Sequence, residues 1–191
     1  MNKDYMAHET AVIDEGCSIG AGSRIWHFSH IMPGSIIGDD CNIGQNVVIS
    51  PKVILGNRVK IQNNVSVYTG VICEDEVFLG PSMVFTNIKN PRSAVIRRDQ
   101  YIKTLVRKGA TIGANATIIC GIEIGKYSFI GAGAVVVKDV PAYGLVLGNP
   151  ARHIGWMSEY GHRLDFDKEG KATCQESGEI YVLKDGQVYR R

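Results

Sequence analysis

A six-residue period runs through most of the chain and limits the folds that it can adopt. Every sixth residue from Ile13 to Phe85 is apolar, and most of these residues are branched aliphatics. The series breaks after Phe85 and resumes from Ile112 to Val136. This period matches neither the 3.6-residue repeat of a helix nor the two-residue alternation of strands in hairpins. It predicts short strands joined by tight corners.

A second column of residues supports this interpretation. Two positions before each aliphatic residue stands a small or β-branched residue, such as Ser23, Ser29 or Val47, and a glycine often follows the aliphatic residue. Glycine, asparagine and aspartate tolerate the backbone dihedral angles that tight corners need. With three strands to a coil and about 4.8 Å between coils, we expect about six coils in a prism roughly 29 Å tall. The sequence therefore predicts an all-β solenoid.

The repeat is interrupted from Thr86 to Gly109, and this excursion is rich in positive charge. Its cations are Lys89, Arg92, Arg97, Arg98, Lys103, Arg107 and Lys108 and its one acid is Asp99, a net charge of +6 in a chain whose total is +2. Long irregular excursions from a compact fold are usually functional or disordered. The segment is either a solvated surface loop or an electrostatic funnel for an anionic substrate.

The segment from Arg24 to His30 gathers aromatic and basic residues outside the inward columns. Ile25 and Ser29 point inward by register, which leaves Arg24, Trp26, His27, Phe28 and His30 outward or at corners. Exposed aromatic rings beside cations are unusual on a solvated face. They indicate a nucleotide pocket or a contact between subunits. Gln45 and Asn63 share the eighteen-residue column of His27 and extend a possible polar track, whereas Asn46 and Asn64 are typical of a structural corner ladder.

The stretch after the excursion ends in a distinctive run. Val106-Arg107-Lys108-Gly109-Ala110 is followed by two coils, then by residues 131–141, which begin Gly-Ala-Gly-Ala, and by Gly148-Asn149-Pro150-Ala151-Arg152. With these motifs, residues 1–160 resemble the hexapeptide-repeat acyltransferases. The resemblance implies a left-handed parallel β-helix that forms a homotrimer, with active sites between neighbouring prisms and the excursion loop bordering the acetyl-CoA site.

The resemblance also implies where acetyl-CoA binds. Backbone groups near Gly131 and Ala132 would line the channel for the pantetheine arm, and their N–H groups would stabilise an oxyanion. Lys138 and Arg152 would contact the phosphates of CoA, and we add Arg107 and Lys108 to this cofactor-binding set. The alternative is that the glycines serve only as corners and the cations only as surface charges.

Three shorter stretches resemble one subgroup, the bacterial UDP-2-acetamido-3-amino-2,3-dideoxyglucuronate N-acetyltransferases. They are the segment from Arg24 to His30, Val84-Phe85-Thr86-Asn87 and Asn90-Pro91-Arg92. The resemblance implies acetylation of the 3-amino group of a UDP-linked amino-uronic acid, a precursor of O-antigen and related surface polysaccharides. The expected substrate-binding residues are Arg24, Trp26, His27, Phe28, His30, Arg92, Arg97 and Arg98.

Asn87 matches the asparagine that lies beside the amine and the thioester in the resembled family, and it is the expected catalytic residue. No histidine, glutamate or cysteine occurs from Val84 to Val95. We therefore expect the sugar amine to attack the thioester directly, with the Asn87 side-chain oxygen orienting it. The alternatives are that Asn87 only caps a strand end, and that His27 or His30 acts as a base across a subunit boundary.

Residues 157–191 leave the repeat. Asp185-Gly186 lies between alternating apolar residues, a strong hairpin signal. The predicted organisation is a β-helix domain over 1–156 and a small β-hairpin appendage over 157–191. Cys174 and His162 are too few to complete a structural zinc site, which needs four ligands, so no metal is expected.

Composition excludes several other classes. The five cysteines are scattered, residues Met1 to Gly16 contain no apolar signal region, and no run approaches 18 apolar residues. These features predict a cytoplasmic protein without disulfides or membrane insertion. One basic loop is too short a surface for nucleic acid, and the histidines are badly spaced for a carbonic-anhydrase-like metal site. The remaining alternatives are an O-acetyltransferase, an enzyme using another acyl donor, an N-acetyltransferase for another nucleotide-linked amino sugar, and a non-catalytic assembly scaffold.

Overall fold

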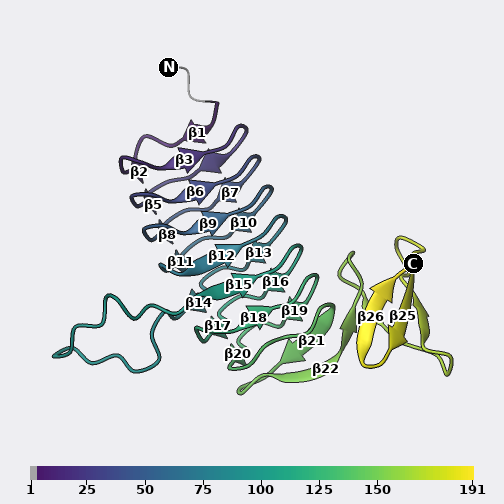
Figure 1. The fold of residues 1–191 in the computed structure, drawn as a ribbon. Coiled ribbons are helices and arrows are strands. Elements are labelled where there is room, and N and C mark those ends of the chain that lie inside the picture. The colour runs from purple at the N-terminus through teal and green to yellow at the C-terminus, as the bar shows by residue number, and fades with distance from the viewer. Residues whose placement is uncertain (1–3) are drawn as a thin grey trace.

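The computed structural model describes residues 4–191, and the part of the predicted first domain before Asp4 lies outside them. The described residues form β-strands and turns, and no helix able to span a membrane occurs among them. Three parallel sheets make the walls of a solenoid (Figure 1). The predicted all-β solenoid is confirmed.

The strands fall into four sheets. Sheet A contains β1 (Met6–Ala7), β4 (Arg24–Ile25), β7 (Asn42–Ile43), β10 (Lys60–Ile61), β13 (Phe78–Leu79), β16 (Thr111–Ile112), β19 (Phe129–Ile130), β21 (Gly144–Leu147), β22 (Arg152–Met157) and β23 (Arg163–Leu164). Sheet B contains β2 (Val12–Ile13), β5 (His30–Ile31), β8 (Val48–Ile49), β11 (Ser66–Val67), β14 (Val84–Phe85), β17 (Thr117–Ile118) and β20 (Val135–Val136). Sheet C contains β3 (Ser18–Ile19), β6 (Ile36–Ile37), β9 (Ile54–Leu55), β12 (Val71–Cys73), β15 (Thr104–Val106) and β18 (Glu123–Ile124). The fourth sheet contains β24 (Lys171–Thr173), β25 (Ile180–Lys184) and β26 (Gln187–Arg190).

The two columns read from the sequence build the core. Before the excursion loop, each strand pairs with the strand eighteen residues later, so that Ile43 lies between Ile25 and Ile61, and all three are fully buried. Small residues fit beside them, and the Ser29 hydroxyl donates 2.7 Å to the carbonyl of Gly44 in the next coil. The inward columns are confirmed. Ala11, Ile13, Cys17 and Ile19 are only partly buried, because a neighbouring coil covers the first coil on one side alone, and Ile122 is also partly buried.

The corners use the left-handed backbone conformation that the glycine, asparagine and aspartate content predicted. Asn46 and Asn64 have φ of 57° and 61°. The Asn46 Nδ2 donates 2.9 Å to the Asn64 Oδ1. This confirms the predicted corner ladder.

Two details of the predicted solenoid are wrong. Sheet A has eight parallel strands, β1 to β21, so there are eight levels rather than about six, and about 34 Å separates the first from the last. The excursion also ends earlier than Gly109, because β15 already pairs with β12. Val106 is fully buried and Thr104 nearly so. They stand one hexad before Ile112 and continue both inward columns, which shortens the loop to residues 86–103.

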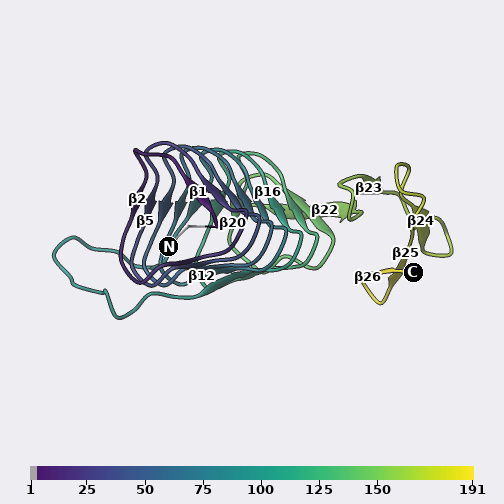
Figure 2. The same cartoon turned by 90° about the horizontal axis from the view of Figure 1, so that it is seen from above.

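The three edges of the prism carry different features. We name each edge by the sheets that it joins, so that the A–B edge holds the corners that follow strands of sheet A, and the B–C and C–A edges follow sheets B and C. The excursion loop of residues 86–103 leaves the B–C edge between β14 and β15. The loop and the C-terminal appendage project to opposite sides of the prism (Figure 2).

The appendage is a three-stranded antiparallel sheet. The Asp185–Gly186 turn joins β25 to β26, with φ of 49° and 71°, and the predicted hairpin is confirmed. A cluster with Tyr181 at its centre packs on Tyr143 of the solenoid. The Tyr143 hydroxyl donates to Glu159 at 2.8 Å, and Arg190 contacts both Glu159 and Glu179. These contacts hold the appendage against the last coils.

Candidate active site

Asn87 stands at the base of the excursion loop, directly after β14. Its carbonyl accepts a hydrogen bond from the Ile102 N–H at 2.9 Å, which closes the two ends of the loop on each other. The preceding hydroxyl, Thr86 Oγ1, accepts from the Cys120 N–H at 2.9 Å and ties the loop to the next coil. Asn87 is therefore held on the B–C edge, with its half-buried side chain in a hollow of the loop.

Three of the predicted substrate-binding residues share that hollow. Arg92, Arg97 and Arg98 line it together with Asn87. Among residues 4–191, no carboxylate forms an ion pair with these arginines or with Lys89 and Lys103. The positive charge of the loop is therefore free to act on a ligand.

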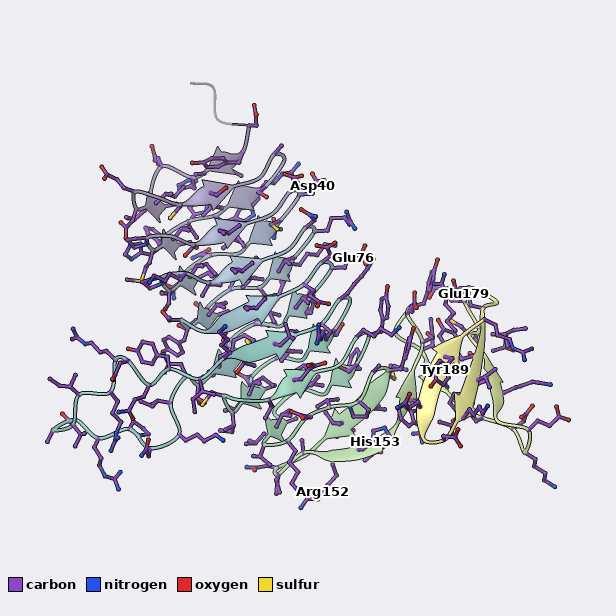
Figure 3. All side chains as sticks on the ribbon, viewed as in Figure 1. Asp40, Glu76, Arg152, His153, Glu179 and Tyr189 are labelled. Atoms are coloured by element: carbon purple, nitrogen blue, oxygen red, sulfur yellow. The ribbon has the colours of Figure 1, made fainter. Side chains whose placement is uncertain are left out.

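Arg107 and Lys108 do not belong to this loop. They follow β15 on the C–A edge, where Arg107 contacts Glu74 at 2.8 Å and Glu123 at 2.9 Å, and Lys108 contacts Glu76 at 3.6 Å. Hydrogen bonds to Glu123 and Glu74 raise the pKa of the Arg107 guanidinium. The predicted loop charge of +6 is thus corrected to +4, because these two cations are corner residues paired with acids. Glu76 marks this edge in Figure 3.

Lys138 and Arg152 come together at the C-terminal end of the solenoid. Both line a hollow of about 260 Å³ beside β20 and β22, and Arg152 and His153 lie at that end in Figure 3. His153 was not among the predicted site residues. Burial lowers its pKa, which favours the neutral form of the ring. Its position next to Arg152 was the only sequence signal, because the period of six does not continue into β22.

Gly131 and Ala132 form the A–B corner that follows β19. Gly131 is buried, and a Cβ there would meet Leu147 Cδ2 at 1.9 Å, so a side chain does not fit without movement of Leu147. Ala132 is exposed, and among residues 4–191 no group accepts a hydrogen bond from its N–H. This edge therefore offers an open backbone N–H donor at Ala132.

The aromatic residues of the first coils lie on the same A–B edge, at its other end. Trp26 and His27 line a hollow of about 330 Å³ with the polar residues of the two coils below, including Gln45 and Asn63. The Trp26 Nε1 donates to Asn42 at 2.9 Å, and the His27 ring stacks on His8 with centroids 3.5 Å apart. Gln45 and Asn63 therefore form a polar surface below His27. Asn42 and Gln62 also line it, but their outward positions resembled any solvated face in the sequence.

The other predicted acceptor residues lie around this hollow. Phe28 is 61% exposed at a corner with φ of 58°. Arg24 projects from sheet A, and His30 projects from sheet B with its Nε2 2.9 Å from Asp14 Oδ2. None of these three lines the hollow of Trp26. The structure therefore separates a Trp26–His27 pair from three flanking residues.

The candidate residues do not meet within one chain. Asn87, Lys138 and the loop arginines lie on the B–C edge, whereas Trp26, His27 and Ala132 lie on the A–B edge across sheet B. His30 lies on β5 and Asn87 directly follows β14. These strands are three steps apart in sheet B, a separation of about 14 Å along the solenoid axis. A general base must lie within hydrogen-bonding distance of its proton. Neither His27 nor His30 reaches Asn87 in the same chain.

No group of three or more potential metal ligands occurs among residues 4–191. In the appendage, the His162 Nε2 lies 2.6 Å from Glu176, and hydrogen bonding to this carboxylate raises the pKa of His162. Cys174, two residues before Glu176 in the sequence, is a free and buried cysteine.

Comparison with known proteins agrees with the fold. Residues 16–51 and 103–138 match the bacterial transferase hexapeptide (six repeats), and residues 35–69 match the hexapeptide repeat of succinyl-transferase. The chain is 44% identical over 95% of its length, and 92% of the relative's, to the dTDP-3-amino-3,6-dideoxy-alpha-D-galactopyranose 3-N-acetyltransferase of Aneurinibacillus thermoaerophilus. It is 39% identical over 69% of its length to the 2,3,4,5-tetrahydropyridine-2,6-dicarboxylate N-acetyltransferase of Brevibacillus brevis, of which it spans 55%.

Solved structures share the solenoid. A hexapeptide-repeat-containing acetyltransferase of Vibrio cholerae, solved with acetyl-CoA, matches 61% of this chain and 70% of its own, with a TM-score of 0.50 and 26% identity. The polySia-specific acetyltransferase NeuO matches 78% of this chain and 82% of its own, with a TM-score of 0.51, and its 17% identity makes it a likeness of fold alone. The repeat, the edge geometry and the similarity over nearly the whole chain show that the protein belongs to the hexapeptide-repeat acetyltransferase family.

Proposed function

We propose that the protein transfers the acetyl group of acetyl-CoA to the 3-amino group of a nucleotide-linked sugar. The observation that carries this proposal is the 44% identity, over nearly the whole of both chains, to a 3-N-acetyltransferase of a dTDP-linked amino sugar. The 6-deoxy sugar in that relative's name has no carboxylate. The similarity therefore favours a neutral 3-amino sugar over the UDP-linked amino-uronic acid that the sequence motifs had suggested, and both remain substrates to test.

The reaction uses groups on two edges. The amine attacks the thioester carbonyl, forming the C–N bond, and the C–S bond breaks to release CoA. Asn87 accepts a hydrogen bond from the amine and orients its lone pair. A backbone N–H such as that of Ala132 stabilises the oxyanion. The leaving thiolate, with a cysteine-like pKa of about 8.5, takes up the excess proton.

Because Asn87 and Ala132 lie on opposite edges of sheet B, the proposed site needs two chains. If the B–C edge of one copy meets the A–B edge of another, the contact is heterologous, and three such contacts close into a ring. We therefore propose a homotrimer with its active sites between prisms. The Trp26 hollow would then hold the nucleotide base by stacking, and the hollow of Lys138 and Arg152 would hold phosphates of CoA.

The proposal is tested with a panel of acceptors. The purified protein is mixed with acetyl-CoA and the dTDP-linked 3-amino-3,6-dideoxyhexose, the UDP-linked 3-amino uronic acid, or a matched sugar with a 3-hydroxyl group. Thiol release is followed by absorbance and the product by mass spectrometry. We expect release with one or both amino sugars and none with the hydroxyl sugar. Release only with the hydroxyl sugar would show an O-acetyltransferase, and no release from any acceptor would refute the proposal.

A further inference from the structure

The hollow of the excursion loop is a concentrated cationic site. It has a volume of about 240 Å³ and is lined by Asn87 and by three arginines, Arg92, Arg97 and Arg98. The only acid in the loop, Asp99, forms no ion pair with any cation of residues 4–191. Three guanidinium groups around one hollow repel one another unless an anion joins them. The hollow is thus built as an anion site that the chain itself does not fill.

Arg97 carries the clearest sign of a missing partner. Its Nε is buried and has no hydrogen-bond acceptor among the described residues, while its Nη1 donates to the neutral Gln100 Oε1 at 3.1 Å. Arg107 provides the contrast within the same chain, because its Nε, Nη1 and Nη2 all donate to the carboxylates of Glu74 and Glu123. Buried N–H donors are nearly always paired, and a planar guanidinium pairs best with a carboxylate or a phosphate.

We propose that this hollow binds an anionic group carried by the acceptor sugar itself, with Arg97 as its main ligand. The inference rests on the proposed function and deepens it. Asn87 lines the same hollow, so an amine held on C3 of the sugar by Asn87 brings the substituents two ring carbons away, on C1 and C5, towards the arginines. The phosphates of CoA are separated from the thioester by the whole pantetheine arm. The anion is therefore the diphosphate on C1 of the sugar or a carboxylate on C5.

Steady-state kinetics test this inference and separate the two sources. We compare the wild type with Arg97→Gln and Arg97→Lys, which keeps the charge but loses the planar donors. Arg163→Gln, a matched change at a side chain 60% exposed in the appendage, is the control. Each protein is assayed with two nucleotide-linked 3-amino sugars, one with a C5 carboxylate and one with a neutral C5 substituent, and melting curves show that the variants are folded.

We expect Arg97→Gln to raise the KM for the sugar about tenfold or more and to leave the KM for acetyl-CoA unchanged. We expect a smaller rise for Arg97→Lys and none for the control. A rise for the carboxylated sugar alone identifies the carboxylate as the bound group, and an equal rise for both sugars identifies the diphosphate. An unchanged KM for both sugars, or a rise confined to acetyl-CoA, overturns the inference.

Calorimetric binding without acetyl-CoA keeps this test independent of turnover. If the wild type binds a sugar nucleotide but acetylates neither sugar, the proposed function fails, while a weakened affinity in Arg97→Gln still supports the anion site. Equal affinity of the wild type and Arg97→Gln overturns the anion site even if acetylation proceeds. Absence of binding of either sugar nucleotide to the wild type also overturns it.

Discussion

Replacing Ile61 in the stacked core by a charged residue should strongly destabilise the protein. This side chain is fully buried on β10, and its neighbours in register are Ile43 and Leu79, both fully buried and apolar. In Ile61→Asp, the transfer free energy of the isoleucine side chain is lost, about 1.5–3 kcal/mol. A carboxyl group is also left among aliphatic side chains without a partner, at a cost of at least about 2 kcal/mol. The free energy of unfolding should therefore fall by about 3.5–5 kcal/mol or more.

The adjacent residue supplies the matched control. Lys60 lies on the same strand but points outward and is exposed, so Lys60→Asp should change the stability by less than about 0.5 kcal/mol. In a chain of this size, about 4 kcal/mol corresponds to a fall in Tm of roughly 8–16 °C. Thermal unfolding followed by circular dichroism measures both variants. If Ile61→Asp melted within two or three degrees of the wild type, the inward column would not be the core that we describe.

Three further predictions concern the reaction, the cofactor and pH. In steady-state kinetics, Asn87→Ala should lower kcat clearly, whereas His27→Asn and His30→Asn should mainly change KM. If either histidine variant lost more than about 10²-fold in kcat while still folded and assembled, the reaction would require a histidine base. Lys138→Gln and Arg152→Gln should each raise the KM for acetyl-CoA while the KM for the sugar stays constant. If the KM for acetyl-CoA were unchanged in both variants, Lys138 and Arg152 would not belong to the cofactor site. The pKa of His162 is raised by its hydrogen bond to Glu176, so the stabilisation that this pair supplies is fully present below the unfolded-state pKa of about 6.5 and is lost as pH rises through the folded-state pKa. The Tm difference between the wild type and His162→Gln should therefore shrink from pH 5.5 to pH 8.5 (about one unit below to two above that pKa), and a difference that does not change with pH would contradict this linkage.

Local features of the sequence determined most of the fold. The six-residue spacing of aliphatic side chains has only one burial solution, in which Ile25, Ile43 and Ile61 stack, because a slip of one residue would turn every apolar side chain outward. The corner dihedrals follow from residue type only in part. Asn46 and Asn64 tolerate a positive φ, whereas Phe28, Lys52 and Arg58 adopt it because the stacked coils require it at that position. The Asp185–Gly186 turn needs nothing beyond its two residues and the alternation on either side.

The tertiary structure decided which charged and polar groups meet. The period of six tells which residues face inward but not which edge a corner occupies, because the edge depends on where the excursion loop rejoins the coil. Val106 rejoins one hexad earlier than expected, which places Arg107 on the C–A edge against Glu74 and Glu123, thirty-three residues before it and sixteen after it. The same stacking leaves Arg97 without a carboxylate and puts Asn87 and Ala132 on opposite edges. Such partnerships arise only when coils stack, since charges interact through space and not along the sequence.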